Sequence, residues 1–167
     1  MSKTDENLSA AFAGESQANR RYLAFARKAE AEGQTQAAKL FRAAAAAETV
    51  HAHSHLGVMG GVKSTADNLR AAVEGEHYEF TTMYPEFMET AQAEGCRRAV
   101  TSFDYANQVE KVHHALFEKM LAAMSAGEKP AEADLFVCSV CGNTFEGSAP
   151  GTCPICGTER ERFMKIE

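Results

Sequence analysis

The sequence predicts an all-α four-helix bundle with one crossover connection, followed by a small C-terminal metal-binding module with four cysteine ligands. Three observations carry this prediction. Long stretches with helical apolar periodicity, separated by glycines, fill most of the first 127 residues. A Glu-x-x-His motif occurs twice, and two Cys-x-x-Cys pairs lie near the C-terminus. The expected division is a bundle over 1–127, a linker over 128–134 and the module over 135–167.

The first two helices are expected at about 7–32 and 35–59. Gly33 follows the first helix and Gly60-Gly61 follows the second, as is typical of helix C-termini. Large apolar residues recur at helical spacing in both stretches, and the simplest interpretation is that they form the core. These residues include Phe12, Phe25, Leu40 and Phe41.

The other two helices are expected at about 66–95 and 96–125. Pro85 lies inside the third helix and should kink it, because its ring displaces a backbone hydrogen bond. The loops within each pair are short, whereas the link between the pairs, at about 62–66, is longer. This pattern describes a bundle with one crossover.

The C-terminal module has the spacing of a four-thiolate metal site. Two residues separate Cys138 from Cys141, and two separate Cys153 from Cys156, so each pair can aim both sulfurs at one ion. Two disulfides are the alternative, which the unpaired Cys96 and the absence of an apolar signal stretch disfavour. Zinc and iron both accept four thiolates, so the spacing leaves the ion open. We interpret Cys96 itself as a buried or weakly exposed thiol.

Charge and hydropathy exclude two classes of partner. The net charge of −6 and the pI near 5.5 argue against nucleic acid, whose phosphates require a basic face. No run approaches the roughly 20 apolar residues of a membrane span. Metal-bound thiolates without a secretion signal fit the reducing cytoplasm, which is the expected location.

The two halves of the bundle resemble each other, as in a duplicated helical hairpin. Gly14-Glu15 matches Gly75-Glu76 at an offset of 61, and Glu48-x-x-His51 matches Glu110-x-x-His113 at an offset of 62. Each Glu-x-x-His places a carboxylate and an imidazole on one helix face. One further glutamate from each remaining helix completes the ligand set of a carboxylate-bridged dimetal bundle. Carboxylates with two imidazoles suit iron or manganese.

One residue breaks this symmetry. Glu79 stands one turn after Glu76, whereas the matching position of the first helix is Ala18. An exposed glutamate is the simple alternative, but the spacing places Glu79 on the metal face. We therefore interpret it as a seventh ligand that serves only one of the two metals. Helix geometry turns the neighbouring histidines off that face, toward the surface or into packing roles. These are His53, His55, His77 and His114.

With these motifs the chain resembles the rubrerythrin family, in which a ferritin-like diiron bundle precedes a rubredoxin-like Fe(Cys)4 module. The resemblance covers nearly the whole chain. It rests on Gly14-Glu-Ser-Gln-Ala, Glu48-x-x-His51, Gly75-Glu76-x-x-Glu79, Met83-Tyr-Pro-Glu-Phe87, Glu110-x-x-His113 and both Cys-x-x-Cys-Gly knuckles.

The resemblance implies a role for each ligand. Glu48 and Glu110 would bridge both irons, and Glu15 would be a terminal ligand of the first iron. Glu76 and His113 would hold the second iron. Glu79 when oxidised, and His51 when reduced, would be alternative ligands of the first. Tyr22 and Tyr84 occupy positions where the family has tyrosines near the ligands, although both also fit an amphipathic core.

The resemblance further implies a non-haem diiron peroxidase that reduces hydrogen peroxide to water and protects against oxidative stress. Electrons would come from an NADH-linked donor of the rubredoxin or reductase type, through the Fe(Cys)4 site, in which zinc is a possible substitute. The alternative is a ferritin-like protein that oxidises and handles iron. A homodimer or higher homo-oligomer is expected, with the cysteine module of one chain serving the diiron site of another.

Overall fold

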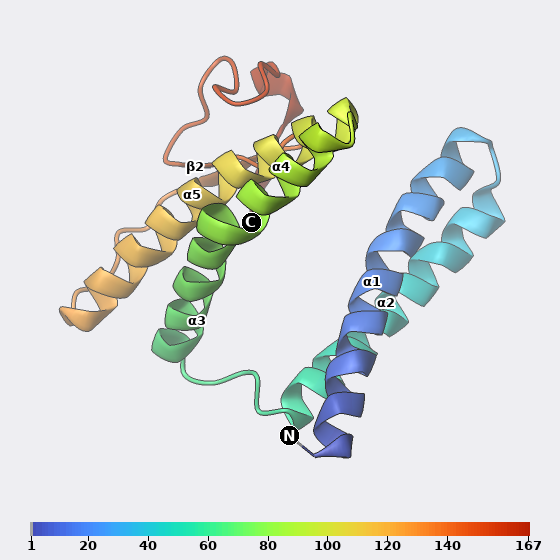
Figure 1. The fold of residues 1–167 in the computed structure, drawn as a ribbon, viewed down its shortest axis with the longest axis horizontal. Coiled ribbons are helices and arrows are strands. Elements are labelled where there is room, and N and C mark those ends of the chain that lie inside the picture. The colour runs from blue at the N-terminus through green and yellow to red at the C-terminus, as the bar shows by residue number, and fades with distance from the viewer. Residues whose placement is uncertain (1) are drawn as a thin grey trace. The chain divides into compact units, whose positions relative to one another are not determined.

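The computed structural model describes residues 2–167. The chain forms two compact units, the first ending at Lys63 and the second spanning Ser64–Glu167. Figure 1 shows a helical hairpin in the first unit, and helices with a small sheet in the second. Among the described residues, no helix is both long enough and apolar enough to cross a membrane.

The first unit is an antiparallel hairpin of α1 (Lys3–Ala31) and α2 (Thr35–Val58). Helix α1 begins before the expected residue 7, because Ser2 and Asp5 cap each other's backbone in a capping box. Gly33 joins the helices at a φ of +72°, in the left-handed region that glycine tolerates best. The two helices run side by side along their whole length (Figure 1).

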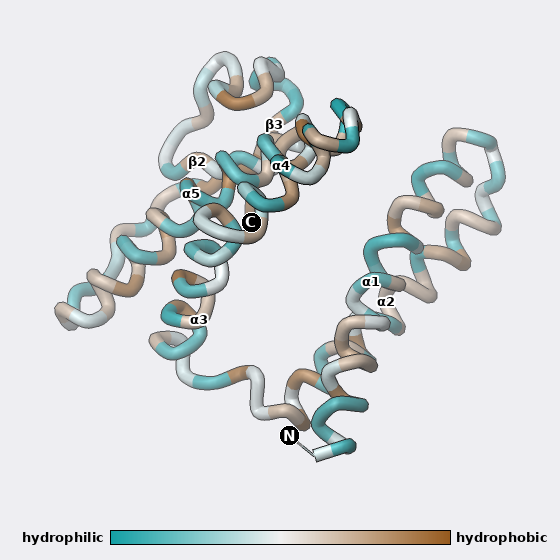
Figure 2. The backbone as a smooth tube through the Cα atoms, viewed as in Figure 1, coloured by the Kyte–Doolittle hydropathy of each residue, from teal (hydrophilic) through white to brown (hydrophobic). Residues whose placement is uncertain are grey.

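Small residues form the seam between α1 and α2. Asn19 also ties the helices together, since its Nδ2 donates to the carbonyl of Ala45 at 2.7 Å and to Thr49 Oγ1 at 2.8 Å. The buried residues are Ala26, Ala29, Ala38, Ala45 and Ala52. Alanine allows two helices to approach closely at low entropic cost. In Figure 2, apolar segments recur along both helices of this hairpin.

The expected core of large apolar residues is only partly realised. Phe12 and Phe41 are half-buried, but Phe25 remains 46% exposed and Leu40 68% exposed. The prediction that Phe25 and Leu40 lie in the core is therefore wrong for this hairpin. The reason is that the alanine seam is narrow, and a pair of helices covers one stripe of each partner rather than a full face.

The helical part of the second unit is a second hairpin with an interrupted first arm. Tyr84 N–H bonds to the carbonyl of Glu79, five residues back, which defines a wide π turn just before Pro85. The interruption occurs where the sequence predicted a kink, and its form is a π turn. The elements are α3 (Thr65–Tyr78), the π segment η1 (Glu79–Met83), α4 (Tyr84–Ala93) and α5 (Arg97–Ser125).

Each hairpin contains its own cluster of three aromatic rings, and the matching positions of the two clusters extend the sequence duplication. The ring centroids lie 5.5 to 6.3 Å apart in the first unit and 5.6 to 6.4 Å apart in the second. The rings are Tyr22, Phe25 and Phe41, with Tyr84, Phe87 and Phe103 at the matching positions 62 residues later. Tyr22 and Tyr84 therefore pack in equivalent environments.

The cysteine module is a three-stranded antiparallel sheet with the strand order β2-β1-β3. Phe136 on β1 pairs with Phe145 on one side and Lys165 on the other, and Phe145 stacks on Phe163 at 5.2 Å. The strands are β1 (Leu135–Cys138), β2 (Thr144–Glu146) and β3 (Phe163–Ile166), with a short 3-10 turn η2 (Arg160–Arg162) before the last.

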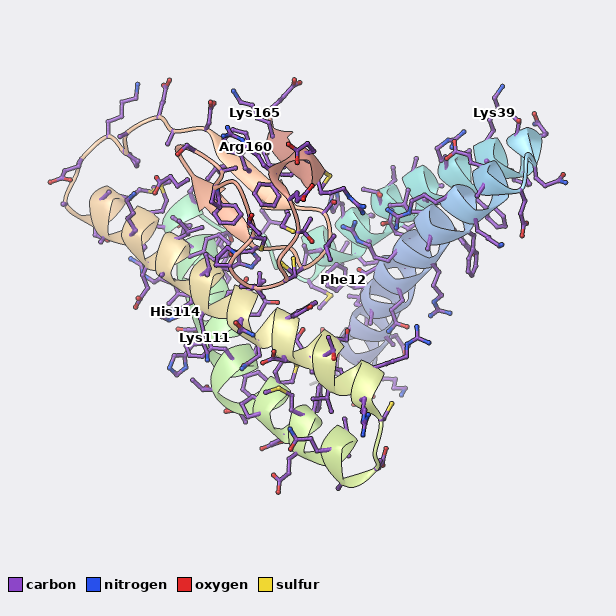
Figure 3. All side chains as sticks on the ribbon, turned by 90° about the horizontal axis from the view of Figure 1, so that it is seen from above. Phe12, Lys39, Lys111, His114, Arg160 and Lys165 are labelled. Atoms are coloured by element: carbon purple, nitrogen blue, oxygen red, sulfur yellow. The ribbon has the colours of Figure 1, made fainter. Side chains whose placement is uncertain are left out.

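The module packs against α5 of its own chain. Gly142 lies against the buried Val109, Lys119 forms an ion pair with Glu146, and β2 runs beside the helix. Figure 3 shows Arg160 and Lys165 on the module and Lys111 on α5. The expectation that the module serves the diiron site of another chain concerns an assembly of two chains and stays a prediction. The chain reverses after α5, where Gly127 adopts a φ of +71°.

Candidate metal centres

Three predicted ligands converge within the first hairpin. Glu15 on α1, and Glu48 and His51 on α2, each offer a ligand atom, and these atoms lie within 4.8 Å of one another. Oε2 of Glu48 lies 2.9 Å from Nδ1 of His51. The Glu48 side chain is 17% exposed and that of His51 is 55% exposed, so the imidazole lies toward the open side of this group. We call these three residues half-site 1.

The matching three residues converge within the second hairpin and form half-site 2. They are Glu76 on α3 and Glu110 and His113 on α5, again with ligand atoms within 4.8 Å of one another. Nδ1 of His113 lies 2.8 Å from Glu110 and 3.8 Å from Glu76. Burial and the negative charge of Glu110 raise the pKa of Glu76. These two effects outweigh the opposing charges of His113 and His114, so a bound cation would relieve the excess negative charge of the group.

Glu79 lies near half-site 2 but outside the converging group. It is the first residue of the π segment, and burial together with the charge of Glu76 raises its pKa. Burial and the charge of Glu79 also raise the pKa of the Tyr84 hydroxyl. The π turn thus separates Glu79 from the regular α-helical register of Glu76, as suits a ligand that has no counterpart in the first hairpin.

The imidazole of His113 connects half-site 2 with the cysteine module. Its Nδ1 faces the glutamates, while Nε2 lies 2.9 Å from Oγ1 of Thr144 on β2. The same hydroxyl lies 3.3 Å from the carbonyl oxygen of Gly142, the residue after Cys141. Metal-binding histidines commonly use their second nitrogen in this way, which fixes the ring. Sequence analysis did not find Thr144, because it lies 31 residues from His113 and belongs to no motif.

Two other residues that the sequence singled out, His114 and Cys96, lie outside the three converging groups. His114 packs its ring 5.4 Å from Phe80 and 5.5 Å from His77, which confirms a packing role for His114. Cys96 is exposed at the start of α5, so the expectation of a buried or weakly exposed thiol is wrong. It lies outside the helix body, where neither α4 nor α5 covers it.

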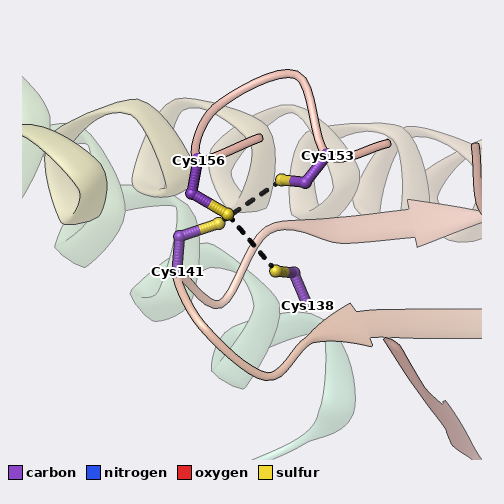
Figure 4. A group of neighbouring side chains, drawn as sticks. All are labelled: Cys138, Cys141, Cys153 and Cys156. Carbon is purple, nitrogen blue, oxygen red and sulfur yellow. Dashed lines mark hydrogen bonds between the residues drawn. The ribbon is translucent and has the colours of Figure 1, made fainter. Parts of the chain in front are cut away.

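The four cysteines of the module converge on one point (Figure 4). Sγ of Cys138 lies 3.6 Å from that of Cys156, and Sγ of Cys141 lies 3.5 Å from that of Cys153. These separations are far longer than the roughly 2 Å of a disulfide and close to the edge of a tetrahedron of metal-bound thiolates. Cys138 and Cys153 are buried, each with 1% of its surface exposed.

Each knuckle of the cysteine site is closed in the same way. Gly142 N–H donates to the carbonyl of Cys138, and Gly157 N–H donates to that of Cys153, both at 2.9 Å. The two glycines have φ values of +87° and +73°, as such knuckles require. The two pairs therefore present their sulfurs from two equivalent turns, as the spacing predicted.

The electrostatics of the cysteine site also fit a bound cation. Burial raises the pKa of the Cys141 thiol. Although burial also disfavours the Cys156 thiolate, hydrogen bonding to Thr158 and to neighbouring thiols lowers the pKa of Cys156 to about 6. Four thiolates in this space would repel one another strongly without a metal ion. The donor set and its geometry thus fit a tetrahedral iron or zinc ion.

The fold and these sites together define a class of protein. It is a helical carboxylate-dimetal protein with an attached four-thiolate metal module. Each hairpin supplies two carboxylates and one imidazole, which is half of such a dimetal ligand set.

Comparisons with known proteins agree with this class and narrow it. Residues 6–121 match the rubrerythrin family model, and residues 136–164 match the model of the rubrerythrin rubredoxin-like domain. The chain is 36% identical to a rubrerythrin of Porphyromonas gingivalis, over 99% of this chain and 91% of that one. It is also 36% identical to nigerythrin of Nitratidesulfovibrio vulgaris, over 98% and 86%. A structure of nigerythrin described as fully reduced and all ferrous matches with a TM-score of 0.59 and 33% identity, over 99% of this chain and 88% of that one.

The chain therefore belongs to the rubrerythrin family. Its fold is a ferritin-like helical bundle with a rubredoxin-like four-cysteine module, and its cofactors are a non-haem diiron centre and one Fe(Cys)4 site. Members of this family are oxidoreductases. The two half-sites and the four-cysteine site described above are the residues that fit these cofactors.

Proposed function

We propose that the protein is a peroxidase that reduces hydrogen peroxide to water at a diiron centre built from half-sites 1 and 2. The reaction consumes two electrons and two protons for each peroxide and releases two molecules of water. The observation that carries the proposal is the contact between His113 of half-site 2 and Thr144 of the cysteine module. A site that only stores iron does not require a second redox centre in contact with one of its ligands.

The ligand roles are those that the family resemblance implies, and the convergence of three ligands within each hairpin supports them. Glu48 and Glu110, each beside its own histidine, would bridge the two irons. Glu15 would complete the first iron, and Glu76 with His113 the second. His51 and Glu79 would alternate on the first iron with its redox state.

The diiron centre and the Fe(Cys)4 site would supply different chemistry. When bound, paired irons would supply the two electrons for peroxide reduction, and thiolate-bound iron would pass electrons one at a time. The protein residues position and charge-balance these centres. The carboxylates offset the metal charge, and Glu79 would be a nearby proton acceptor when it is not bound to iron. The Tyr84 hydroxyl remains protonated, because burial and the charge of Glu79 raise its pKa.

Thr144 would connect the two centres. Its hydroxyl touches Nε2 of His113 and the carbonyl of Gly142, so a short hydrogen-bonded path joins a diiron ligand to a cysteine knuckle. The ion pair of Lys119 with Glu146 holds β2 against α5 beside this path. The module is therefore positioned to deliver electrons to half-site 2 of its own chain.

Thr144→Val tests this connection. We expect steady-state peroxide reduction to fall roughly tenfold, the lower end of the effect of losing a partner that orients a metal ligand. Iron content should not change, because Thr144 binds no metal. Rates with a reductase system, together with iron per chain, provide the measurement. Thr152→Val, on the exposed side of the module, is the control. Equal rates for both variants would remove the role proposed for Thr144.

Glu79→Ala should have a milder effect than the loss of a bridging ligand. Six ligands remain, so two irons per chain should stay bound, while the cycle slows and the potential of the diiron centre shifts. Iron analysis and a redox titration measure the two effects. The distinction fails if Glu79→Ala loses iron as completely as Glu48→Ala.

Iron handling is the second candidate, and the position of the module favours the peroxidase. Titrating the anaerobically reduced protein with hydrogen peroxide separates them. A peroxidase consumes one peroxide for each reduced diiron centre and half of one more through the single electron of each module, and it binds no further iron. An iron-handling protein instead oxidises and retains many added irons per chain. An NADH-linked donor of the rubredoxin or reductase type would supply the electrons. The five thiols, none in a disulfide among the described residues, fit the reducing cytoplasm.

A further inference from the structure

We propose that each diiron centre is completed between two copies of the chain, with α1 and α2 of one copy packing against α3 to α5 of the other. The inference rests on the proposed diiron function and adds which copy of the chain supplies half-site 1 and which supplies half-site 2. The observation that carries it is the length of the connection between the hairpins.

The connection from α2 to α3 is short. Helix α2 ends at Val58 and α3 begins at Thr65, which leaves six residues and seven Cα-to-Cα steps between them. Fully extended, these steps span at most about 25 Å.

A ferritin-like bundle needs a longer connection if one chain is to form it alone. In this fold the connection crosses the bundle from one end to the other, so that α2 and α3 run in the same direction. Val58 lies ten residues beyond Glu48, and Thr65 lies eleven residues before Glu76. With the glutamates at one level, the helix ends are about 31 Å apart along the axis at 1.5 Å per residue. Helices also stand about 8 to 10 Å apart, so the required span is about 33 Å.

Caps at the end of α2 and at the start of α3 keep the terminal turns helical, so these turns do not unwind to lengthen the connection. Gly60, at a φ of +65°, ends α2, and Gly61 N–H bonds back to the carbonyl of Leu56 at 2.9 Å. The Ser64 hydroxyl accepts a hydrogen bond from Asp67 N–H at the start of α3. The extended stretch is thus shorter than six residues, and closing the deficit would unwind both capped turns.

A single chain with this short connection could form a bundle only if α2 ended and α3 began at the same end of that bundle. Helices α2 and α5 would then run in the same direction. Because each histidine follows its glutamate by one turn, His51 and His113 would both lie on one side of the bridging pair Glu48 and Glu110. In the crossover arrangement the two imidazoles lie on opposite sides, one for each iron, as the ligand roles require. Exchange of hairpins between two copies preserves the crossover arrangement of the imidazoles. The short connection then links a hairpin of one bundle to a hairpin of the other bundle.

Pairing two inactive variants tests the exchange. Chains with Glu48→Ala and chains with Glu110→Ala, carrying different affinity tags, are co-expressed and purified through both tags. If hairpins are exchanged, one bundle of each mixed dimer carries both substitutions and the other carries none. We expect about half of the wild-type diiron content and activity in a two-fold dimer. If each chain forms its own bundle, every bundle carries one substitution and neither quantity recovers.

The control pair places both substitutions in the same hairpin. Glu48→Ala with Glu15→Ala leaves every bundle defective in either arrangement, so recovery only in the first pair supports the exchange. Helicity of each variant alone shows whether it folds, and Glu15→Ala with Glu76→Ala is the replacement pair if Glu110→Ala does not fold. No recovery in a folded cross-hairpin pair, or a wild-type monomer with a complete diiron centre, overturns the proposal. Wild-type diiron content and activity remain independent tests of the proposed function.

Lengthening the connection gives a second test. Inserting about twelve glycine and serine residues between Val62 and Lys63 adds more than the missing span. We expect the lengthened chain to keep its two diiron irons while the paired variants lose their recovery, because each chain can then close its own bundle. Undiminished recovery with the long connection would show that its length does not direct the exchange.

Discussion

Replacing Glu110 with alanine is expected to abolish peroxide turnover and to empty the diiron centre. Glu110 lies 2.8 Å from His113 and converges with Glu76, so its loss removes the proposed bridge and disturbs the second iron at once. Losing a partner of a metal ligand costs about 10- to 100-fold in affinity or activity, and losing a bridging ligand should exceed that range. Iron per chain and steady-state peroxide reduction measure the two effects.

The control for this variant lies on the same helix. Glu118 on α5 is 59% exposed and pairs only with His114 among the described residues, so Glu118→Ala should leave iron content and activity unchanged. The Glu110→Ala protein should keep its Fe(Cys)4 absorption, which shows that the second unit remains folded. An active Glu110→Ala protein with two diiron irons would contradict the assignment of half-site 2.

The second large effect is expected from removing the cysteine ligands. With Cys138→Ala and Cys153→Ala, the module loses its metal and the two buried sulfurs at its centre. A module of this size depends on its metal for folding, so the contact from Thr144 to His113 is lost as well. Steady-state turnover should fall to the level of the mixture without protein.

The diiron centre of this variant should survive. Prereduced protein should still react once with peroxide, because the ligands of half-sites 1 and 2 are intact. Single-turnover and steady-state rates, measured on one preparation, separate the two roles. Cys96→Ser is the matched control, since Cys96 is exposed and belongs to neither site. Full steady-state activity without the module's cysteines would contradict its role as an electron relay.

The sequence predicted those parts of the sites that lie close together along one helix or one knuckle. Glu48 and His51 are neighbours through helix periodicity, and Cys138 and Cys141 through a tight turn, so their spacing fixes their contacts. The offset of 62 residues relates the two Glu-x-x-His motifs from the sequence alone. Within each hairpin, the structure brings together the three residues that this symmetry pairs.

Contacts between elements could not be predicted in this way. The docking of the module depends on a reversal at Gly127 and on surface matching between β2 and α5, and neither leaves a periodic pattern. The exposure of Leu40 depends on how narrow the alanine seam is, which hydrophobicity alone does not show. The length of the connection depended on the caps at Gly60 and Ser64, which decide where the helices stop.

The reaction of the fully reduced, iron-loaded protein with hydrogen peroxide tests the central claim most directly. The protein is mixed anaerobically with one peroxide per diiron centre, while the visible iron–thiolate absorption and the remaining peroxide are followed. We expect rapid consumption of the peroxide. Each module then holds one remaining electron, so the Fe(Cys)4 absorption should return when more peroxide is added, and the electrons of two modules together reduce one additional peroxide. Peroxide that persists beside a reduced diiron centre, or a module that stays reduced with excess peroxide, would contradict a peroxidase supplied through the cysteine module.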